Sequence, residues 1–151
     1  MDFEIRCAKR SDISVIVELV YQLAIYEKKS PDKIGINAQK VEDYCFGERK
    51  CFDCCIVWVK EKPVGYALYS FRFSGWAGKP VLYLEDLFVL PDFRRQSIGT
   101  SLLKHLASVA QENGCAFMEW LVLDWNKTAQ AFYEQLGARI RKDVLVCRMD
   151  V

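Results

Sequence analysis

Hydrophobic side chains recur along the chain at two periods, and the changes of period divide it into helices and strands. The segment EIRCAKRSD has the pattern of a strand followed by a turn. Apolar residues then recur at helical spacing from Ile13 to Ala24, behind Ser11 or Asp12, which predicts a capped helix. The segment AQKVEDYCFG predicts a second, short helix that Gly47 closes.

The middle of the chain has the composition of strands. CCIVWVK and YALYSFRF are rich in β-branched and aromatic residues, and the segment EKPVG between them predicts the turn of a hairpin. VLYLEDLFVL is long enough to form a third strand of the same meander.

The second half alternates helices and strands. Residues 98–113 carry one apolar face and predict a helix that Gly114 ends. AFMEWLVL is apolar on both alternating faces apart from Glu119, which predicts a central strand covered on both sides. Asn126 is the expected cap of a last helix, Gly137 is its expected end, and VLVCRM predicts a final strand.

This order of elements predicts one α+β domain, residues 1–151, in which an antiparallel meander precedes a strand, helix, strand, helix series. A chain of 151 residues, 52% of them hydrophobic, can bury the core of one domain. The formal net charge is only +1, which argues against nucleic acid or an anionic membrane as a partner. The sequence shows neither a signal peptide nor an apolar run of membrane length, so we expect a soluble, cytoplasmic protein.

Seven cysteines in a chain without an export signal indicate reduced thiols rather than a disulfide framework. The segment CFDCC, residues 51–55, is the candidate for a zinc site, because three cysteines lie close together there. However, Cys54 and Cys55 are neighbours in a predicted strand and would point to opposite faces, and the only histidine, His105, lies in a distant helix. We therefore expect buried thiols there and no metal.

The segment FRRQSIGTSLLKHL, residues 93–106, contains the clearest candidate for a ligand site. A helix that begins here leaves its first amides, near residues 98–100, without internal partners and at the positive end of the helix dipole, which favours an anion. Gly99 would let a phosphate approach the backbone, and Arg94 and Arg95 would add positive charge. On these residues alone, a solvated turn before a helix remains the alternative.

The same segment resembles the signature of the Gcn5-related N-acetyltransferase superfamily, Arg/Gln-x-x-Gly-x-Gly/Ala, which reads RRQSIG over residues 94–99. Ser97 departs from the pattern, where the family usually has glycine, although a serine with negative φ would still offer its amide. YLEDLFV, LDWN and AFYEQLGA, together with FRRQSIGTSLL, resemble the diamine acetyltransferase branch, which includes thialysine acetyltransferases. The resemblance implies a mixed central sheet flanked by helices, acetyl-coenzyme A as acetyl donor, and a homodimer.

The resemblance also implies which residues contact the cofactor. Splayed strand amides would lie along its pantetheine arm, the turn would bind its pyrophosphate, and the start of the last helix would add further contacts. The implied residues are Leu87, Phe88, Val89, Arg94, Arg95, Gln96, Ser97, Ile98, Gly99, Thr100, Asn126, Lys127, Thr128 and Ala129.

Acetyl transfer by direct attack in a ternary complex needs a base for the amine, whose pKa is about 10.4, and an acid for the departing thiolate. Glu85 is the expected base and Asp86 the second choice, the alternative being structural ion pairs. On a regular strand the two would face opposite sides, so both reach one substrate only if the strand carries a bulge, which the resemblance implies. The resemblance also implies that Tyr133, beside the apolar stripe of its helix, is the acid.

An amine cation favours carboxylates and aromatic faces. The candidate acceptor residues are Tyr26, Glu27, Trp76, Glu85, Asp86, Glu119, Trp120 and Leu121. Ser74 stands where polyamine-specific members have an acidic residue, and the tail lacks their Glu-Gly-Trp segment, which favours a small diamine, thialysine or a lysine-like amino acid over spermine. Acetylation of a protein amino group, which requires an open groove rather than a cleft closed by Trp76, and a non-catalytic coenzyme A-binding module are the alternatives.

Overall fold

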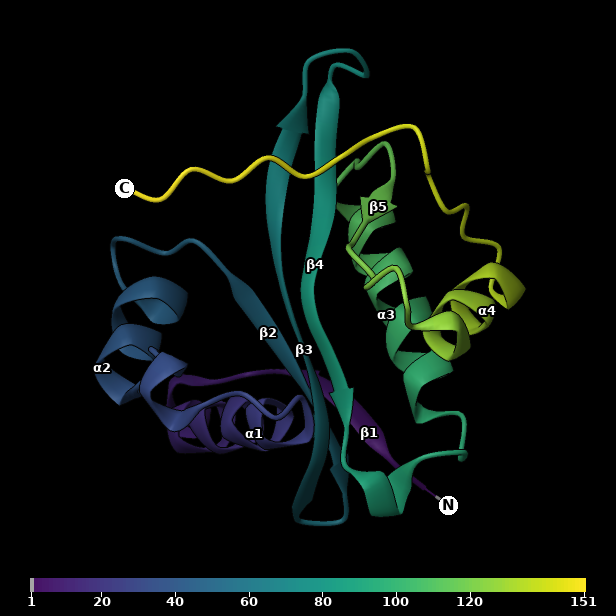
Figure 1. The fold of residues 1–151 in the computed structure, drawn as a ribbon. Coiled ribbons are helices and arrows are strands. Elements are labelled where there is room, and N and C mark those ends of the chain that lie inside the picture. Colours follow the sequence, from purple (N-terminus) through teal and green to yellow (C-terminus); the bar gives the residue numbers. More distant parts are fainter. Residues whose placement is uncertain (1) are drawn as a thin grey trace. The chain divides into compact units, whose positions relative to one another are not determined.

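The computed structural model describes residues 2–151, which divide into two compact units, one ending at Trp120 and the other spanning Leu121–Val151. The first unit contains a five-stranded sheet in the order β1-β2-β3-β4-β5, in which the first four strands are antiparallel and β5 runs parallel to β4 (Figure 1). This confirms the predicted α+β class with a mixed sheet. Its elements are β1 (Glu4–Cys7), α1 (Ile13–Tyr26), α2 (Ala38–Val41), β2 (Asp53–Val59), β3 (Lys62–Ser74), β4 (Lys79–Val89), α3 (Ile98–Glu112) and β5 (Met118–Glu119).

Helices cover both faces of this sheet. Helices α1 and α2 lie on one face and α3 on the other (Figure 1). Because neighbouring residues of a strand point to opposite faces, the core beneath α1 takes alternate residues of β2, β3 and β4. That core consists of Ile16, Leu19, Val41, Cys45, Cys54, Ile56, Tyr66 and Phe88.

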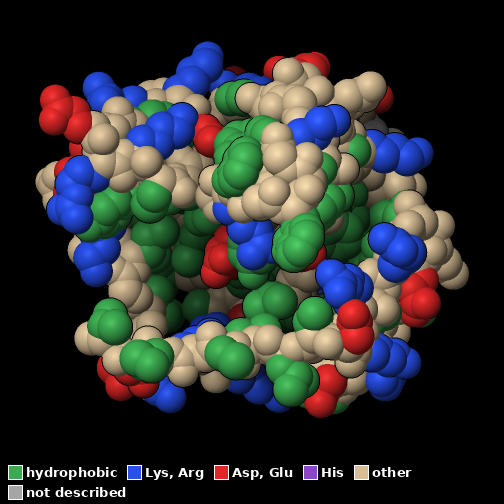
Figure 2. Space-filling model, turned by 90° about the horizontal axis from the view of Figure 1, so that it is seen from above, with side chains coloured by type: hydrophobic (Ala, Val, Ile, Leu, Met, Phe, Trp, Pro, Cys, Tyr) green, Lys and Arg blue, Asp and Glu red, His purple; other side chains and the backbone are tan. Residues whose placement is uncertain are grey.

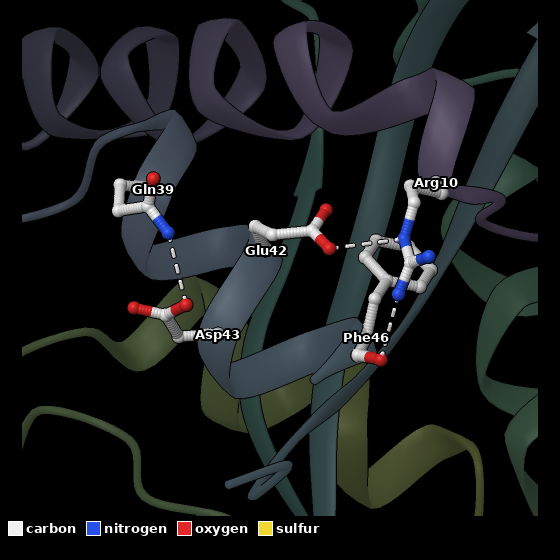
Figure 3. A network of polar contacts seen from close by, with 5 residues as sticks. All are labelled: Arg10, Gln39, Glu42, Asp43 and Phe46. Atoms are coloured by element: carbon white, nitrogen blue, oxygen red, sulfur yellow. Dashed lines mark hydrogen bonds and ion pairs between the residues drawn. The ribbon is translucent and has the colours of Figure 1, made fainter. Parts of the chain in front are cut away.

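The predicted short helix is α2 followed by a π-helical turn, η3 (Glu42–Phe46). Polar contacts attach this turn to the start of α1 (Figure 3). Arg10 Nε lies 3.1 Å from Glu42 Oε1, and Arg10 Nη2 donates to the Phe46 carbonyl at 3.0 Å. These groups are largely exposed, so the contacts fix the position of the turn more than they add to stability.

The hairpin between β2 and β3 turns at Lys60 and Glu61, ahead of the predicted turn EKPVG. Lys60 takes the left-handed conformation, with a φ of 57°, that such a tight turn requires. Gly65 instead lies inside β3, where an added Cβ would stand 2.7 Å from the Phe88 carbonyl oxygen. The glycine is therefore needed for the close approach of β4 and not for the turn.

Helix α4 (Lys127–Gln135) belongs to the second unit and begins and ends as predicted. Asn126 Oδ1 accepts a hydrogen bond from Ala129 N–H at 3.1 Å, and Gly137 follows the helix with a φ of +95°. Two predicted strands are wrong. AFMEWLVL forms only the two-residue β5, and VLVCRM forms no strand in the part of the chain described. Apolar alternation makes a strand only where a neighbour completes the ladder.

The CFDCC segment leads into β2. Cys54 and Cys55 are buried, and burial raises the pKa of the Cys55 thiol to about 12. Among residues 2–151, no group of three or more His, Cys, Asp or Glu side chains is placed to hold a metal ion. Basic and acidic side chains are interspersed on the face in Figure 2, and no helix in this range is long and apolar enough to cross a membrane.

Candidate active site

The centre of the candidate site is a β-bulge in β4. Two hydrogen bonds locate the change in phase: the Leu82 N–H donates to the Phe117 carbonyl, toward β5, whereas the Leu90 N–H donates to the Val64 carbonyl, toward β3. In a regular strand all even-numbered N–H groups point to the same neighbouring strand. The N–H groups of Leu82 and Leu90 point to different neighbours, so one extra residue must lie between these two positions. The register assigns it to Glu85, because Leu84 pairs with Tyr69 and Asp86 with the preceding Leu68.

Beyond the bulge, the odd-numbered amides are the ones that point away from β3. The N–H groups of Leu87 and Val89 therefore face the β5 side of the sheet, and that of Phe88 faces β3. Within residues 2–120, β5 pairs with β4 only at Leu82 and Tyr83, so this edge has no strand partner in the first unit past Tyr83. Of the three amides predicted to contact a cofactor, the geometry supports Leu87 and Val89 and not Phe88.

The bulge also brings the two adjacent carboxylates to one face, as a shared substrate site requires. Tyr83 pairs with Ser70 and Asp86 pairs with Leu68, and Ser70 and Leu68 point to the same face of β3. Because Glu85 lies two residues after Tyr83, its side chain follows the same alternation and shares that face with Asp86. Glu85 acts electrostatically on the phenol of Tyr83 and on the carboxyl of Asp86, and raises the pKa of both. The predicted bulge is thus confirmed.

Asp86 and Glu85 differ in environment. Glu85 is exposed, whereas Asp86 is half-buried and accepts a hydrogen bond from the Tyr66 hydroxyl at 3.0 Å. Burial raises the pKa of Asp86 to about 6, with smaller contributions in the same direction from Glu85 and Glu27, while the Tyr66 hydrogen bond and Lys29 act in the opposite sense. A half-buried carboxyl with this pKa is mostly ionised at neutral pH, which suits contact with a cation.

Aromatic and cationic side chains continue the site toward the end of α1. The rings of Tyr26 and Phe88 lie 6.1 Å apart. The Arg94 guanidinium lies 4.2 Å from the Tyr26 ring and 5.6 Å from the Phe88 ring, and its Nε donates to the Val89 carbonyl at 2.9 Å. Arg94, predicted as a cofactor ligand, thus joins the end of α1 to the turn after β4.

The turn that leads into α3 forms a concave row of amides. Arg95 and Ser97 both adopt the left-handed conformation, with φ values of 60° and 64°, and such alternation turns successive N–H groups toward one point. Ser97 therefore offers its amide from a positive φ and not from the negative φ considered for a serine at this position. The Ser101 N–H donates to the Ser97 carbonyl, so the amides of residues 98–100 precede the helical ladder and point outward. The Gln96 side-chain oxygen is buried without a partner among the described residues.

The remaining predicted acceptor residues are Trp76, Glu119, Trp120 and Leu121. Trp76 is fully exposed at the tip of the β3–β4 hairpin, roughly 20 Å or more from Asp86 by the rise of the strand. In the first unit it therefore closes no cleft over Asp86. Glu119 forms an ion pair with Arg72, whose guanidinium lies 4.7 Å from the Tyr83 ring, which explains how β5 carries a charge. Trp120 is half-buried, and Leu121 is exposed in the second unit.

Tyr133 lies in α4 of the second unit, with its ring 5.5 Å from that of Phe132, and burial raises its pKa. A phenol of raised pKa keeps its proton at neutral pH, as an acid requires, and the role of Tyr133 stays a prediction. Tyr66 was not among the sequence-based candidates. Its position in an apolar strand gave no signal, because the bulge that turns Asp86 toward it is invisible in a period-two pattern.

The family model described as "Acetyltransferase (GNAT) family" matches residues 21–138, which include the bulge, the amide turn and α4. The chain belongs to this family. Its first two helices, its meander and its parallel β5 thus form a GNAT fold, and acetyltransferases of this family use acetyl-coenzyme A.

Relatives of this GNAT protein act on amines. The thialysine N-epsilon-acetyltransferase of Sus scrofa is 40% identical over 143 residues, covering 89% of this chain and 83% of its own. Spermidine/spermine N(1)-acetyltransferase-like protein 1 of Homo sapiens is 35% identical over 143 residues, covering 90% of this chain and 20% of its own. An aminoglycoside N-acetyltransferase in complex with coenzyme A has a TM-score of 0.78 at 20% identity, covering 99% of this chain and 96% of its own. The protein is an acyltransferase that transfers acetyl groups to amines.

Proposed function

We propose that the protein transfers acetyl from acetyl-coenzyme A to a primary amine of a small diamine, thialysine or a lysine-like amino acid. The observation that carries this proposal is the bulge at Glu85, which directs two carboxylates to one face while the amides of Leu87 and Val89 point to the open edge of β4. Glu27 adds a third carboxylate near Asp86, and Tyr26 and Phe88 add aromatic faces. This combination suits a small cation carried on an apolar chain.

Residues of the turn would hold the cofactor, which supplies the activated acetyl group. The amides of residues 98–100 and the left-handed residues Arg95 and Ser97 fit a diphosphate, because they offer several N–H donors and one positive charge without a competing carboxylate in the turn itself. The amides of Leu87 and Val89 would hold the pantetheine arm and the thioester oxygen. The start of α4, Asn126 to Ala129, is the further contact region that the family resemblance implies.

In the proposed reaction the amine attacks the thioester carbonyl directly. Glu85, exposed to solvent, takes the proton of the incoming ammonium through water, and Asp86 holds the cation beside it. As the new C–N bond forms and the C–S bond breaks, the Tyr133 hydroxyl gives its proton to the thiolate, and the second proton lost by the amine nitrogen restores the phenol. The products are the N-acetylated amine and the free thiol, with one proton released to solvent.

We further propose that residues 1–151 act as one catalytic domain in a cytoplasmic homodimer. The family model spans both compact units, and relatives of the same branch cover most of the chain, which supports a shared catalytic function.

The deciding experiment is an amine panel assayed for thiol release from acetyl-coenzyme A. Thialysine, lysine, short diamines and spermine would be compared at equal concentration, with acetylated proteins sought by mass spectrometry. Small amines should turn over, and spermine should be the poorer substrate. Binding of coenzyme A without turnover of any amine would refute the proposal, and acetylated protein lysines as the only product would replace it.

Tyr133→Phe tests the assignment of the acid. The variant should lose roughly 10²- to 10⁴-fold in kcat while its affinity for coenzyme A stays unchanged. Tyr21→Phe, on α1, is the matched control and should behave as the parent protein. An unchanged rate in Tyr133→Phe would remove Tyr133 from the mechanism.

A further inference from the structure

Tyr66 is a polar residue at the centre of an apolar cluster. Its side chain is 0% exposed, and its neighbours in the core beneath α1 include Ile16, Ile56 and Phe88. The ring packs edge-on against that of Phe88, with centroids 6.4 Å apart. A phenylalanine would make the same packing contacts, so packing alone does not account for the hydroxyl.

The hydroxyl of Tyr66 reaches Asp86, a charged and half-buried residue of the site. It donates to Asp86 Oδ2 at 3.0 Å, from the strand next to β4 and on the same face. The direction of the bond is fixed, because an ionised carboxylate only accepts hydrogen bonds. One oxygen of Asp86 is thereby held from the protein interior.

We infer that Tyr66 is a positioning residue for acetyl transfer, whose hydroxyl orients the Asp86 carboxylate and favours its ionised form, so that it receives the ammonium group of the acceptor. This inference rests on the proposed function, since it assigns Asp86 to the amine. It adds a buried residue of β3 to a site otherwise made from β4, the end of α1 and the amide turn.

The electrostatic surroundings of Asp86 show why such a donor is needed. Glu85 on β4 and Glu27 at the end of α1 disfavour a negative charge on Asp86. Cys54 on β2 belongs to the core cluster that contains Tyr66. Lys29 favours the charge but forms an ion pair with Glu27, at 3.9 Å. Burial is the largest effect and raises the pKa of Asp86 to about 6, which the Tyr66 hydrogen bond opposes. With that pKa, about 90% of the carboxyl is ionised at pH 7, and a rise of one unit would leave about half.

Tyr66→Phe removes the hydroxyl and keeps the ring. Tyr69→Phe is the matched control: Tyr69 is also a buried tyrosine of β3, but it points to the opposite face. Two measurements are made on each purified protein. The first is the pH profile of kcat/KM for the best amine of the panel, with coenzyme A affinity measured in parallel. The second is a carbon-13 NMR titration of the Asp86 carboxyl, which does not require turnover.

In Tyr66→Phe we expect the acidic limb of the kcat/KM profile to move to higher pH. The KM for the amine should rise at least about 2-fold at pH 7, the loss of ionised carboxylate that a one-unit rise of its pKa produces, while coenzyme A affinity stays unchanged. The Asp86 carboxyl should titrate at higher pH than in the parent protein. Tyr69→Phe should change neither, and Tyr66→Phe should have no further effect on the profile in an Asp86→Asn background.

Three results would overturn the inference: an unchanged Asp86 titration in Tyr66→Phe, an equal shift in Tyr69→Phe, or an equal loss in the Asp86→Asn background. Failure of the parent protein to acetylate any amine would instead refute the proposed function. The carboxyl titration would then decide the Tyr66–Asp86 link by itself.

Discussion

Asp86→Asn should make the protein more stable at neutral pH while it weakens acetyl transfer. Burial raises the pKa of Asp86 from 3.8 to about 6, so the folded state holds its proton over a range in which the unfolded chain has lost it. The free energy of unfolding therefore falls as pH rises through this window, and above pH 6 the full cost of the buried charge is present. Asparagine has the same shape, can accept the Tyr66 hydrogen bond and carries no charge.

The expected gain follows from the size of the shift. About two pKa units at about 1.4 kcal/mol each set an upper limit near 3 kcal/mol, and we expect about 1 to 3 kcal/mol at pH 8. At pH 4, where the folded-state carboxyl is protonated and the unfolded one, with a pKa of 3.8, is about half ionised, the difference between the two proteins should shrink to a small fraction of its value at pH 8. In the activity assay at pH 8, the same variant should lose at least about 10-fold in kcat/KM for the amine, because its carboxylate no longer meets the cation.

Urea denaturation of both proteins at pH 4 and pH 8 measures this directly. Glu85→Gln is the control, since Glu85 is exposed on the adjacent bulge and its charge should change stability by less than about 0.5 kcal/mol at either pH. If Asp86→Asn were less stable than the parent protein at pH 8, or if its advantage were the same at both pH values, the burial argument would be refuted. A more stable but fully active variant would keep that argument and remove Asp86 from the site.

Three further changes test other parts of the structure. Ser97→Gly should leave the free energy of unfolding within about 0.5 kcal/mol of the parent value, because glycine relieves the left-handed strain at φ 64° but also loosens the unfolded chain. Ser108→Gly, within α3, should lower that free energy by about 0.5 kcal/mol. An equal loss for the two variants in urea denaturation would contradict the left-handed turn. Gly65→Ala should lower the free energy of unfolding by about 1 to 3 kcal/mol, since the new Cβ would stand 2.7 Å from the Phe88 carbonyl oxygen. Gly75→Ala is the control and should change it little, because a Cβ there meets open space. Similar denaturation midpoints for the two variants would argue against the close approach of β3 and β4. Tyr26→Leu should weaken coenzyme A binding a few-fold, because it removes a contact with the Arg94 guanidinium worth about 0.5 to 1 kcal/mol. Calorimetry measures this affinity. Unchanged binding would show that the turn does not depend on that contact.

The sequence predicted the elements whose signals are local. Apolar residues at helical spacing located α1 and α3 to within one or two residues, and Asn126 and Gly137 marked the ends of α4. The strand predictions failed where the outcome depends on a neighbour. VLVCRM has the residues of a strand, but no ladder is formed by it in the described part of the chain, and the turn at Lys60 lacks the glycine or asparagine that usually announces a tight hairpin.

The same distinction applies to the site. Glu85 and Asp86 were recognisable as candidates because two carboxylates in an apolar strand are unusual, and the turn because a helix begins there. The hydroxyl of Tyr66 and the stacking of Arg94 on Tyr26 were not predictable, since each joins residues that are far apart in the chain. The positive φ of Ser97 was not predictable, because serine rarely adopts it and a structure tolerates it only where the surrounding turn enforces it.

The bulge at Glu85 explains why both halves of the proposed reaction come together on β4. In a regular strand, the direction of an N–H group and the face of a side chain are fixed together, residue by residue. Without the extra residue, Asp86 would point to the face that α3 covers, and the amides of Leu87 and Val89 would be bonded to β3. One inserted residue reverses both: it turns Asp86 toward Tyr66 and the end of α1, and it frees two amides at the open edge. The proposed sites for the amine acceptor and for the thioester donor therefore require the same bulge. Loss of the bulge would disrupt both of them.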